Sequence, residues 1–171
     1  MIGSLQIDSF RGLRDLTIDH LSQVNVFVGA NNSGKTSVLE AVKLLSAPDD
    51  VGQVVRIALQ RAQVSAESRK KNIANYVLSI FQKTTDMDSQ QDYYHIKLSV
   101  NVKARDYIYE ADGTVGEAVD STGATKGTLD IAIKTSVNSG KANYRSIQIV
   151  NGDDATYTPT ERPIYNSLYL P

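Results

Sequence analysis

Eight consecutive residues, Gly-Ala-Asn-Asn-Ser-Gly-Lys-Thr at positions 29–36, constrain this chain more than any other feature. They match the pattern G-x-x-x-x-G-K-[ST], in which glycines let the backbone curl so that successive amide N–H groups point at a phosphate. An apolar run at 24–28 precedes the motif, and an amphipathic run at 37–45 follows it. This context predicts a strand, a phosphate-binding loop, and a helix whose N-terminus adds partial positive charge.

The motif predicts a role for each of its polar groups. Lys35 is the expected catalytic cation, because its ammonium should reach the β- and γ-phosphate oxygens of a nucleotide. The Thr36 hydroxyl is the expected Mg²⁺ ligand, although Mg²⁺ keeps several waters and one hydroxyl is only part of a site. Two roles stay open for Ser37, contact with the α-phosphate or an exposed position without function. The amides expected to cradle the β-phosphate belong to Asn31, Asn32, Ser33, Gly34 and Lys35.

The length of 171 residues predicts one folded domain with a hydrophobic core, because it is too short for two domains of ordinary size. The net charge of −1 and the pI of about 6.1 give no global positive field for nucleic acid, which leaves DNA contact through a local patch or through another part of a larger protein. The absence of cysteine excludes disulfides and a cysteine-based zinc site. His20 and His95 are expected at the surface. Without a long apolar run or signal peptide, we expect a cytoplasmic protein with no membrane partner.

The first 48 residues predict three strands, the loop and its helix. Leu5 and Ile7 alternate with polar residues, as do Leu16 and Ile18, which favours an antiparallel hairpin. The third strand, 24–28, is typical of a strand buried on both faces. The helix after the loop should end near residue 45, ahead of a proline.

Residues 49–83 predict a helical insertion made of two helices. Asp50 is a good N-cap with a glutamine three residues later, and an apolar helical period follows it. A polar stretch at 65–72 interrupts the period, which resumes from Ile73. The basic residues at 69–71 are expected to be a solvated turn, with a DNA-facing patch as the alternative.

Residues 92–171 predict an antiparallel β region. Apolar residues alternate at 96–102, 107–109, 129–133 and 147–150, and an Asn-Gly pair predicts a hairpin into a strand near 155–158. A last strand is expected at 164–170. The glycine-rich stretch 111–127 is expected to be a mobile hairpin loop.

A P-loop hydrolase also needs an apolar strand that ends in an acidic residue, which helps to hold Mg²⁺. Asp130 lies in the middle of an alternating strand, and Asp153 and Asp154 follow the predicted hairpin turn. None of these is a convincing match. The sequence therefore contains the phosphate-binding loop but no recognisable strand with the acidic residue that hydrolysis needs.

Three stretches together resemble the N-terminus of ABC/SMC-type ATPases: residues 5–13 (Leu-Gln-Ile-Asp-Ser-Phe-Arg-Gly-Leu), the run 24–28, and the loop followed by Val-Leu-Glu-Ala at 38–41. Within that group the chain is most similar to OLD-family (overcoming lysogenization defect) and related bacterial AAA-like ATPases. The resemblance covers about the first 45 residues, and the rest matches only in general layout.

The resemblance implies an α/β fold with α+β character: a P-loop NTPase lobe with a mixed sheet, a Walker A helix, the helical insertion and the antiparallel β subdomain, all in one ATP-binding lobe over 1–171. It implies that the segment near Phe10 and Arg11 lies beside the nucleotide. From the residues alone, Phe10 is more typical of a core and Arg11 is equally compatible with the surface. The residues that the resemblance assigns to ATP and Mg²⁺ are Gly29, Asn32, Gly34, Lys35 and Thr36.

In that family the signature motif of a second protomer closes over the ATP, and the remaining motifs follow the region matched here. The expected partners are therefore ATP, a second lobe and a second protomer, with DNA as a further candidate. The expected function is ATP binding, with hydrolysis in the completed protein, linked to DNA maintenance or phage defence. These residues alone should turn over ATP slowly or not at all. The alternatives are a non-catalytic, nucleotide-gated interaction module and a self-contained P-loop kinase; a GTPase is disfavoured because the chain lacks Asn-Lys-x-Asp.

Overall fold

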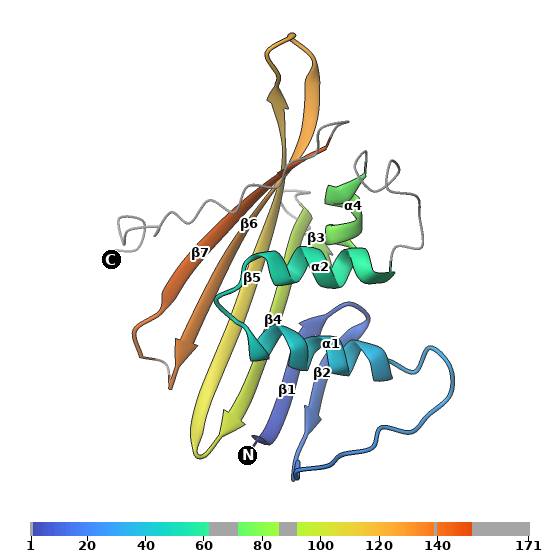
Figure 1. Cartoon of the computed structure of the whole chain (residues 1–171), viewed down its shortest axis with the longest axis vertical. Helices are drawn as coiled ribbons and strands as arrows, with labels where there is room; N and C mark the ends of the chain where they lie inside the picture. Colours follow the sequence, from blue (N-terminus) through green and yellow to red (C-terminus); the bar gives the residue numbers. More distant parts are fainter. Residues whose placement is uncertain (1, 62–71, 86–91, 139, 152–171) are drawn as a thin grey trace.

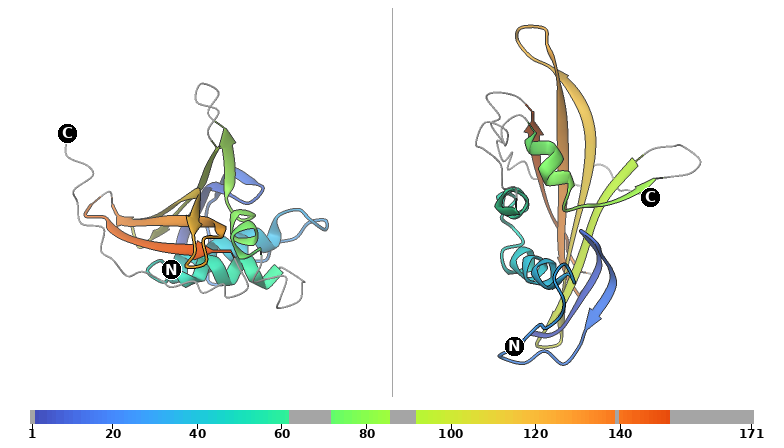
Figure 2. Two further views of the ribbon diagram at one scale, coloured as in Figure 1. Left: turned by 90° about the horizontal axis from the view of Figure 1, so that it is seen from above. Right: turned by 90° about the vertical axis from the view of Figure 1, so that its right-hand side faces the viewer.

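The computed structural model describes residues 2–61, 72–85, 92–138 and 140–151. Three helices cover one face of a sheet in the described part of the chain (Figures 1 and 2). The strands are β1 (Ile2–Phe10), β2 (Leu13–Ile18), β3 (Gln82–Thr85), β4 (Asp92–Val102), β5 (Arg105–Val119), β6 (Thr125–Val137) and β7 (Asn143–Val150). The helices are α1 (Lys35–Ser46), α2 (Gly52–Arg61) and α4 (Ile73–Leu78).

The sheet has seven strands in the order β2-β1-β4-β5-β6-β7, with β3 paired to β4. Each of its pairings is antiparallel. The expected mixed sheet is therefore wrong for the described strands, although the α+β character and the antiparallel region are confirmed. The N-terminal hairpin enters this sheet through β1, which pairs with β4 from a distant part of the sequence.

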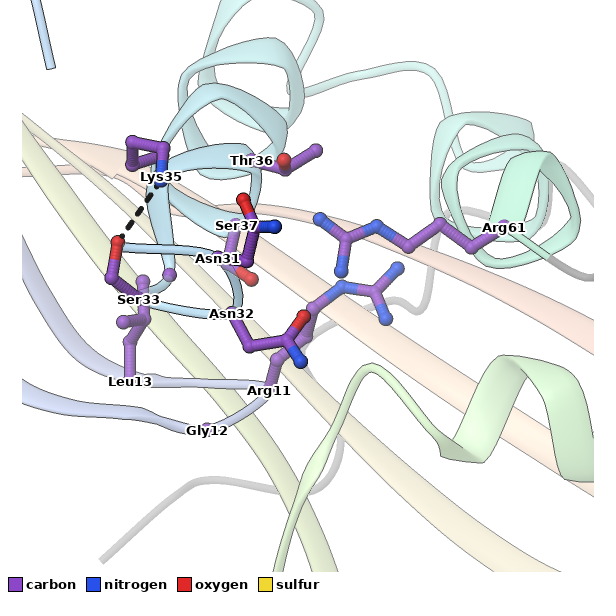
Figure 3. A pocket seen from close by; sticks show the side chains of 11 residues that line it. Arg11, Gly12, Leu13, Asn31, Asn32, Ser33, Lys35, Thr36, Ser37 and Arg61 are labelled. Carbon is purple, nitrogen blue, oxygen red and sulfur yellow. Dashed lines mark hydrogen bonds between the residues drawn. The ribbon is translucent and has the colours of Figure 1, made fainter. Parts of the chain in front are cut away.

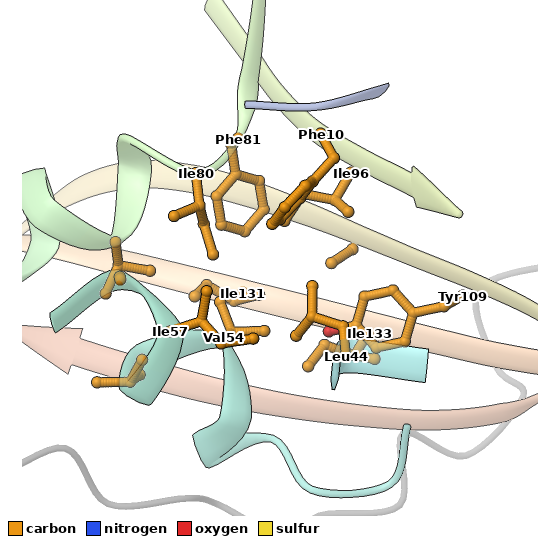
Figure 4. Close-up of a cluster of buried hydrophobic side chains, with 14 of the residues drawn as sticks. Phe10, Leu44, Val54, Ile57, Ile80, Phe81, Ile96, Tyr109, Ile131 and Ile133 are labelled. Carbon is orange, nitrogen blue, oxygen red and sulfur yellow. The ribbon is translucent and has the colours of Figure 1, made fainter. Parts of the chain in front are cut away.

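The core lies between the sheet and the helices, as Figure 4 shows. Period-two alternation in the strands places one row of side chains on this face, and the apolar stripes of α1 and α2 cover it. Its largest fully buried side chains include Tyr109, Phe10, Leu44, Ile57, Ile80, Ile96, Leu98, Ile131 and Ile133. The same hairpin and helix α1 that contribute to this core also flank the loop at 29–34.

The predicted strand at 24–28 is wrong. The segment has no strand structure, and Val24, Val26 and Val28 are 79%, 79% and 90% exposed. The backbone N–H and C=O groups of a strand form hydrogen bonds with a neighbouring strand. No described strand pairs with this segment. The segment therefore has the apolar pattern of a strand without a described element that buries it.

The predicted mobile loop at 111–127 is also wrong. β5 and β6 continue through it in register as far as Val119 and Thr125, so the turn between them is short. Gly113 lies against the Tyr94 and Leu129 side chains, where a Cβ would fall 3.3–3.4 Å from their atoms. Gly113 thus marks close packing between neighbouring strands rather than a break in them. Figure 1 shows the resulting hairpin projecting beyond the rest of the sheet.

The other predicted elements are confirmed where the structure describes them. The hairpin β1–β2, the loop helix to Ser46, the two insertion helices, and β4 to β7 all occur. The insertion is shorter than predicted, because β3 begins at Gln82 where helix or linker was expected. The basic residues 69–71, the strands expected near 155–158 and 164–170, and Asp153 with Asp154 lie outside the described residues. Among the helices described, none has the length and apolar character that crossing a membrane requires.

Candidate phosphate-binding site

Four segments meet around a cavity of about 920 Å³: the β1–β2 turn, the loop before α1, the first turn of α1, and the end of α2 (Figure 3). The cavity is lined by Arg11, Gly12, Leu13, Asn31, Asn32, Ser33, Gly34, Lys35, Thr36, Ser37 and Arg61. Seven of these residues come from the predicted phosphate-binding motif and the serine after it. Gly29 is not among the lining residues.

The loop depends on two glycines for steric reasons. Gly34 has φ +88°, a left-handed conformation that residues with a Cβ rarely adopt, and a Cβ there would lie 2.7 Å from Leu13 Cδ2. At Gly29, a Cβ would lie 2.8 Å from Ser33 Oγ. Asn32 also has a positive φ of 62°, which asparagine tolerates better than most residues. The motif thus places glycine at position 34, whose left-handed backbone disfavours a side chain, and at position 29, where a Cβ would displace the Ser33 side chain.

The N-terminus of α1 is left open toward the cavity. Its N-cap is Gly34, which has no side chain, and no described side chain forms a capping hydrogen bond there. The first N–H groups of a helix have no partner within the helix and carry partial positive charge. In α2, by contrast, Asp50 Oδ1 accepts a hydrogen bond from the Gly52 amide at 3.1 Å. The loop helix therefore offers its amides to an anion, whereas the insertion helix satisfies one of its own.

The Lys35 ammonium folds back over the loop. It donates hydrogen bonds to the carbonyl oxygens of Gly29 at 2.7 Å and Ala30 at 2.6 Å, and it lies 3.3 Å from Ser33 Oγ. These neutral oxygens are weaker acceptors for a cation than phosphate oxygens are. The position keeps the charge within the loop, where a rotation of the flexible side chain can bring it to an anion.

Thr36 and Ser37 both line the cavity, but they differ in exposure. Thr36 is exposed, so its hydroxyl can act as one Mg²⁺ ligand, whereas Ser37 is buried. The exposed alternative for Ser37 is therefore wrong. The described residues contain no group of three or more His, Cys, Asp or Glu side chains placed to hold a metal ion. The residues fit a Mg²⁺ that arrives with phosphates, because phosphate oxygens and waters then supply the remaining ligands.

A buried carboxylate behind the loop holds two arginines. Glu40 lies on the buried face of α1, with Oε2 2.8 Å from Arg11 Nε and Oε1 2.8 Å from Arg61 Nε. The Arg11 and Glu40 side chains are only 12% and 10% exposed, whereas that of Arg61 is 41% exposed. Burial lowers the pKa of Arg11, and the nearby Arg61 adds to this, while the Glu40 carboxylate opposes it. Arg11 Nη2 is buried without a hydrogen-bond partner among the described residues.

The family resemblance placed the Arg11 segment beside the nucleotide, but neither the resemblance nor the residue pattern gave a role to Glu40 or Arg61. The turn geometry positions Arg11, which has φ 53° and whose amide donates to the Ile80 carbonyl at 2.9 Å. Glu40 could have been noticed, because it is a charged residue on the apolar face of a predicted helix. No local signal identifies Arg61, since its place at the cavity depends on how α2 packs against the sheet.

Two other candidate residues lie away from the cavity. Phe10 is fully buried in the core and does not line the cavity, which confirms the core position that its residue type predicts; the neighbouring Arg11 and Gly12 do line the cavity. Asp130 lies on β6 and accepts a hydrogen bond from Gln148 on the neighbouring strand β7 at 2.8 Å. It is thus a cross-strand partner apart from the lining residues, and the cavity has no described acidic lining residue.

Residues 1–158 match the family described as "AAA ATPase domain". An uncharacterized protein of Methanocaldococcus jannaschii is 41% identical over 58 residues, which is 33% of this chain and 26% of that protein. The DNA replication and repair protein RecF of Coxiella burnetii is 51% identical over 45 residues, 26% of this chain and 13% of RecF. RecF of Heliobacterium modesticaldum is 47% identical over 45 residues, 26% of this chain and 12% of that protein.

The matched segments therefore span about a quarter of the archaeal relative and about an eighth of the RecF proteins. No solved structure gives a significant match to this chain.

Proposed function

The chain belongs to the AAA ATPase domain family, and from that premise we propose that its loop binds Mg²⁺-ATP as the N-terminal, nucleotide-binding lobe of an ATPase that acts on DNA. The partial likeness to RecF supports the link to DNA repair. We further propose that the complete protein hydrolyses ATP. We also propose that it is related to the OLD-family ATPases.

The observation that carries the proposal is the combination of an open helix N-terminus with several positive charges. Gly34 leaves the first amides of α1 without a side-chain cap, and Lys35, Arg11 and Arg61 line the same cavity without a described acidic lining residue. A cup of amides and cations of this kind suits a polyphosphate better than a neutral or cationic ligand.

Each polar group of the loop has a separate proposed role in binding Mg²⁺-ATP. The amides of residues 31–35 hold the phosphate chain, and the Lys35 ammonium neutralises charge on the β- and γ-phosphate oxygens. The Thr36 hydroxyl gives one ligand to Mg²⁺, which supplies further charge neutralisation when it is bound. Preorganised positive groups of this kind stabilise charge that develops on a transferring phosphoryl group. The group that activates water is expected from elsewhere in the complete protein.

The exposed valines at 24–28 support a partner that covers the segment leading into the loop. Three alternating valines, each at least 79% exposed, form an apolar edge there. A second lobe that adds strands to this segment would bury them and complete a sheet around the phosphate-binding loop. We propose this lobe, together with a second protomer that closes over the nucleotide, as the partners of the chain.

Two alternatives make different predictions. A non-catalytic, nucleotide-gated module would bind ATP without hydrolysing it even when its partners are present. A self-contained P-loop kinase would transfer phosphate from ATP with these residues alone. The first is favoured over the second, because no acid of the described residues lines the cavity.

The test compares ATP binding and turnover by the wild-type chain with those of Lys35→Ala. Loss of the charge-assisted bonds of Lys35 should weaken Mg²⁺-ATP binding by about ten- to a hundredfold in calorimetric titration. Lys43→Ala is the matched control, because Lys43 is on the same helix but bonds to Gln60 away from the cavity. Equal ATP binding by wild type and Lys35→Ala would overturn the proposal, and rapid turnover by the lone chain would favour the kinase.

A further inference from the structure

Arg61 reaches the phosphate-binding cavity from a helix that the loop motif does not include. It is the last residue of α2, in the insertion, and its side chain is 41% exposed. Its Nε forms an ion pair with Glu40 at 2.8 Å. That pair uses one edge of a planar group that has five N–H donors, so donors remain for a second partner in the cavity.

The charges around the cavity exceed what the protein itself neutralises. Arg11, Arg61 and Lys35 are three cations, and Glu40 is the one carboxylate paired with them among the described residues. Lys35 has only neutral oxygens as described partners. The unpaired positive charge faces a largely open cavity, since the Arg61 side chain is 41% exposed, and it attracts an anion to that place. A nucleoside polyphosphate, which stays anionic after it binds one Mg²⁺, has the complementary charge.

The cations are separated along the cavity. Figure 3 shows Lys35 beside Ser33 on one side and both guanidinium groups on the other, with Ser37 between them. In a loop of this type the lysine reaches the β- and γ-phosphates. The phosphate on the opposite side, toward Ser37 and the arginines, is then the α-phosphate.

We propose that Arg61 is a ligand of the α-phosphate of the bound nucleotide and so attaches the helical insertion to the phosphate-binding loop; this rests on the proposed function. Glu40 fixes the guanidinium at the edge of the cavity, which lowers the entropy lost when the arginine binds phosphate. The nucleotide thus contacts the end of α2 as well as the loop. The insertion becomes part of the binding site rather than a surface addition.

The test measures the affinity of the full chain for Mg²⁺-ATP and Mg²⁺-ADP in wild type and Arg61→Gln. Both nucleotides contain the α-phosphate, so the substitution should weaken both by the same factor, about tenfold. Arg61→Lys keeps the charge but loses the fork of donors, and it should lose less. Arg56→Gln is the matched control on the same helix, because Arg56 contacts Asp50 and Gln53 and does not line the cavity; it should leave both affinities unchanged.

Each outcome decides the proposal. Unchanged affinities in Arg61→Gln, with normal binding by wild type, would overturn the role of Arg61 and leave the proposed function standing. A loss confined to ATP would place Arg61 at the γ-phosphate and would also overturn the proposal. Wild-type protein that binds neither nucleotide would overturn both. A thermal melt of each variant separates loss of binding from loss of folding.

Discussion

Two apolar runs in this chain have opposite surroundings. In β4, Ile96, Leu98 and Val100 are 0%, 0% and 7% exposed beneath the helices. In the segment that leads into the phosphate-binding loop, Val24, Val26 and Val28 are 79% exposed or more. Both runs carry apolar side chains at every second position, so alternation alone does not distinguish them.

The difference between the runs is the presence of neighbours. β4 pairs with β1, β3 and β5, so its backbone groups are hydrogen-bonded. Helices cover its apolar face, so its apolar side chains are buried. β4 is thus part of a packed core. The segment at 24–28, which leads into the loop, has no partner among the described strands. Three substitutions test this contrast in order of decreasing expected effect, the first two with a matched control.

The largest effect should come from Leu98→Ala in β4. Removing a fully buried leucine side chain should lower the free energy of unfolding by about 2–5 kcal/mol, measured by urea titration. Val26→Ala is the counterpart in the exposed segment and should change the free energy by no more than about 0.5 kcal/mol. A large loss in Val26→Ala would show that the lone chain already packs this segment, and the contrast would fail.

A smaller effect is expected from Gly34→Ala at the loop. Alanine would have to adopt φ +88° and its Cβ would displace the Leu13 side chain, so we expect a loss of about 2 kcal/mol with weakened ATP binding. Gly123→Ala is the matched control, because Gly123 has φ +83° but a Cβ there would meet no atom within 4 Å. It should cost about 1 kcal/mol and leave ATP binding unchanged. Equal losses at both glycines would mean that the contact with Leu13 carries no energy.

The smallest effect is expected from Asp50→Ala, which removes the side-chain acceptor for the Gly52 amide at the start of α2. Loss of such a cap should lower the free energy of unfolding by about 1 kcal/mol, with ATP affinity little changed. The contrast is with α1, whose uncapped start is the proposed anion site. If added phosphate stabilised Asp50→Ala more than the wild-type protein, the two helix ends would be alike, and the contrast between them would be wrong.

Local patterns predict most of the fold, because they determine which side chains can be buried together. The β1–β2 hairpin, the loop helix, the two insertion helices and β4 to β7 all follow from residue periodicity and capping residues. The wrong predictions for 24–28 and 111–127 have a common cause, which is that the neighbours of a segment are absent from its own sequence. Gly113 and Gly116 are typical of a break until the strands that pack against them are known, and the valines at 24–28 are typical of a buried strand until the partner proves to be missing from the described residues.

The phosphate-binding loop could be derived from the residue order alone, because glycines at fixed spacing next to a lysine and a threonine meet the steric needs of a tight loop. The surroundings of that loop could not. Arg11 arrives on a hairpin turn, Glu40 on the buried face of α1, and Arg61 at the end of α2, far from Arg11 in the sequence. Their meeting depends on how the helices pack on the sheet, and such long-range packing leaves no signal in the local sequence.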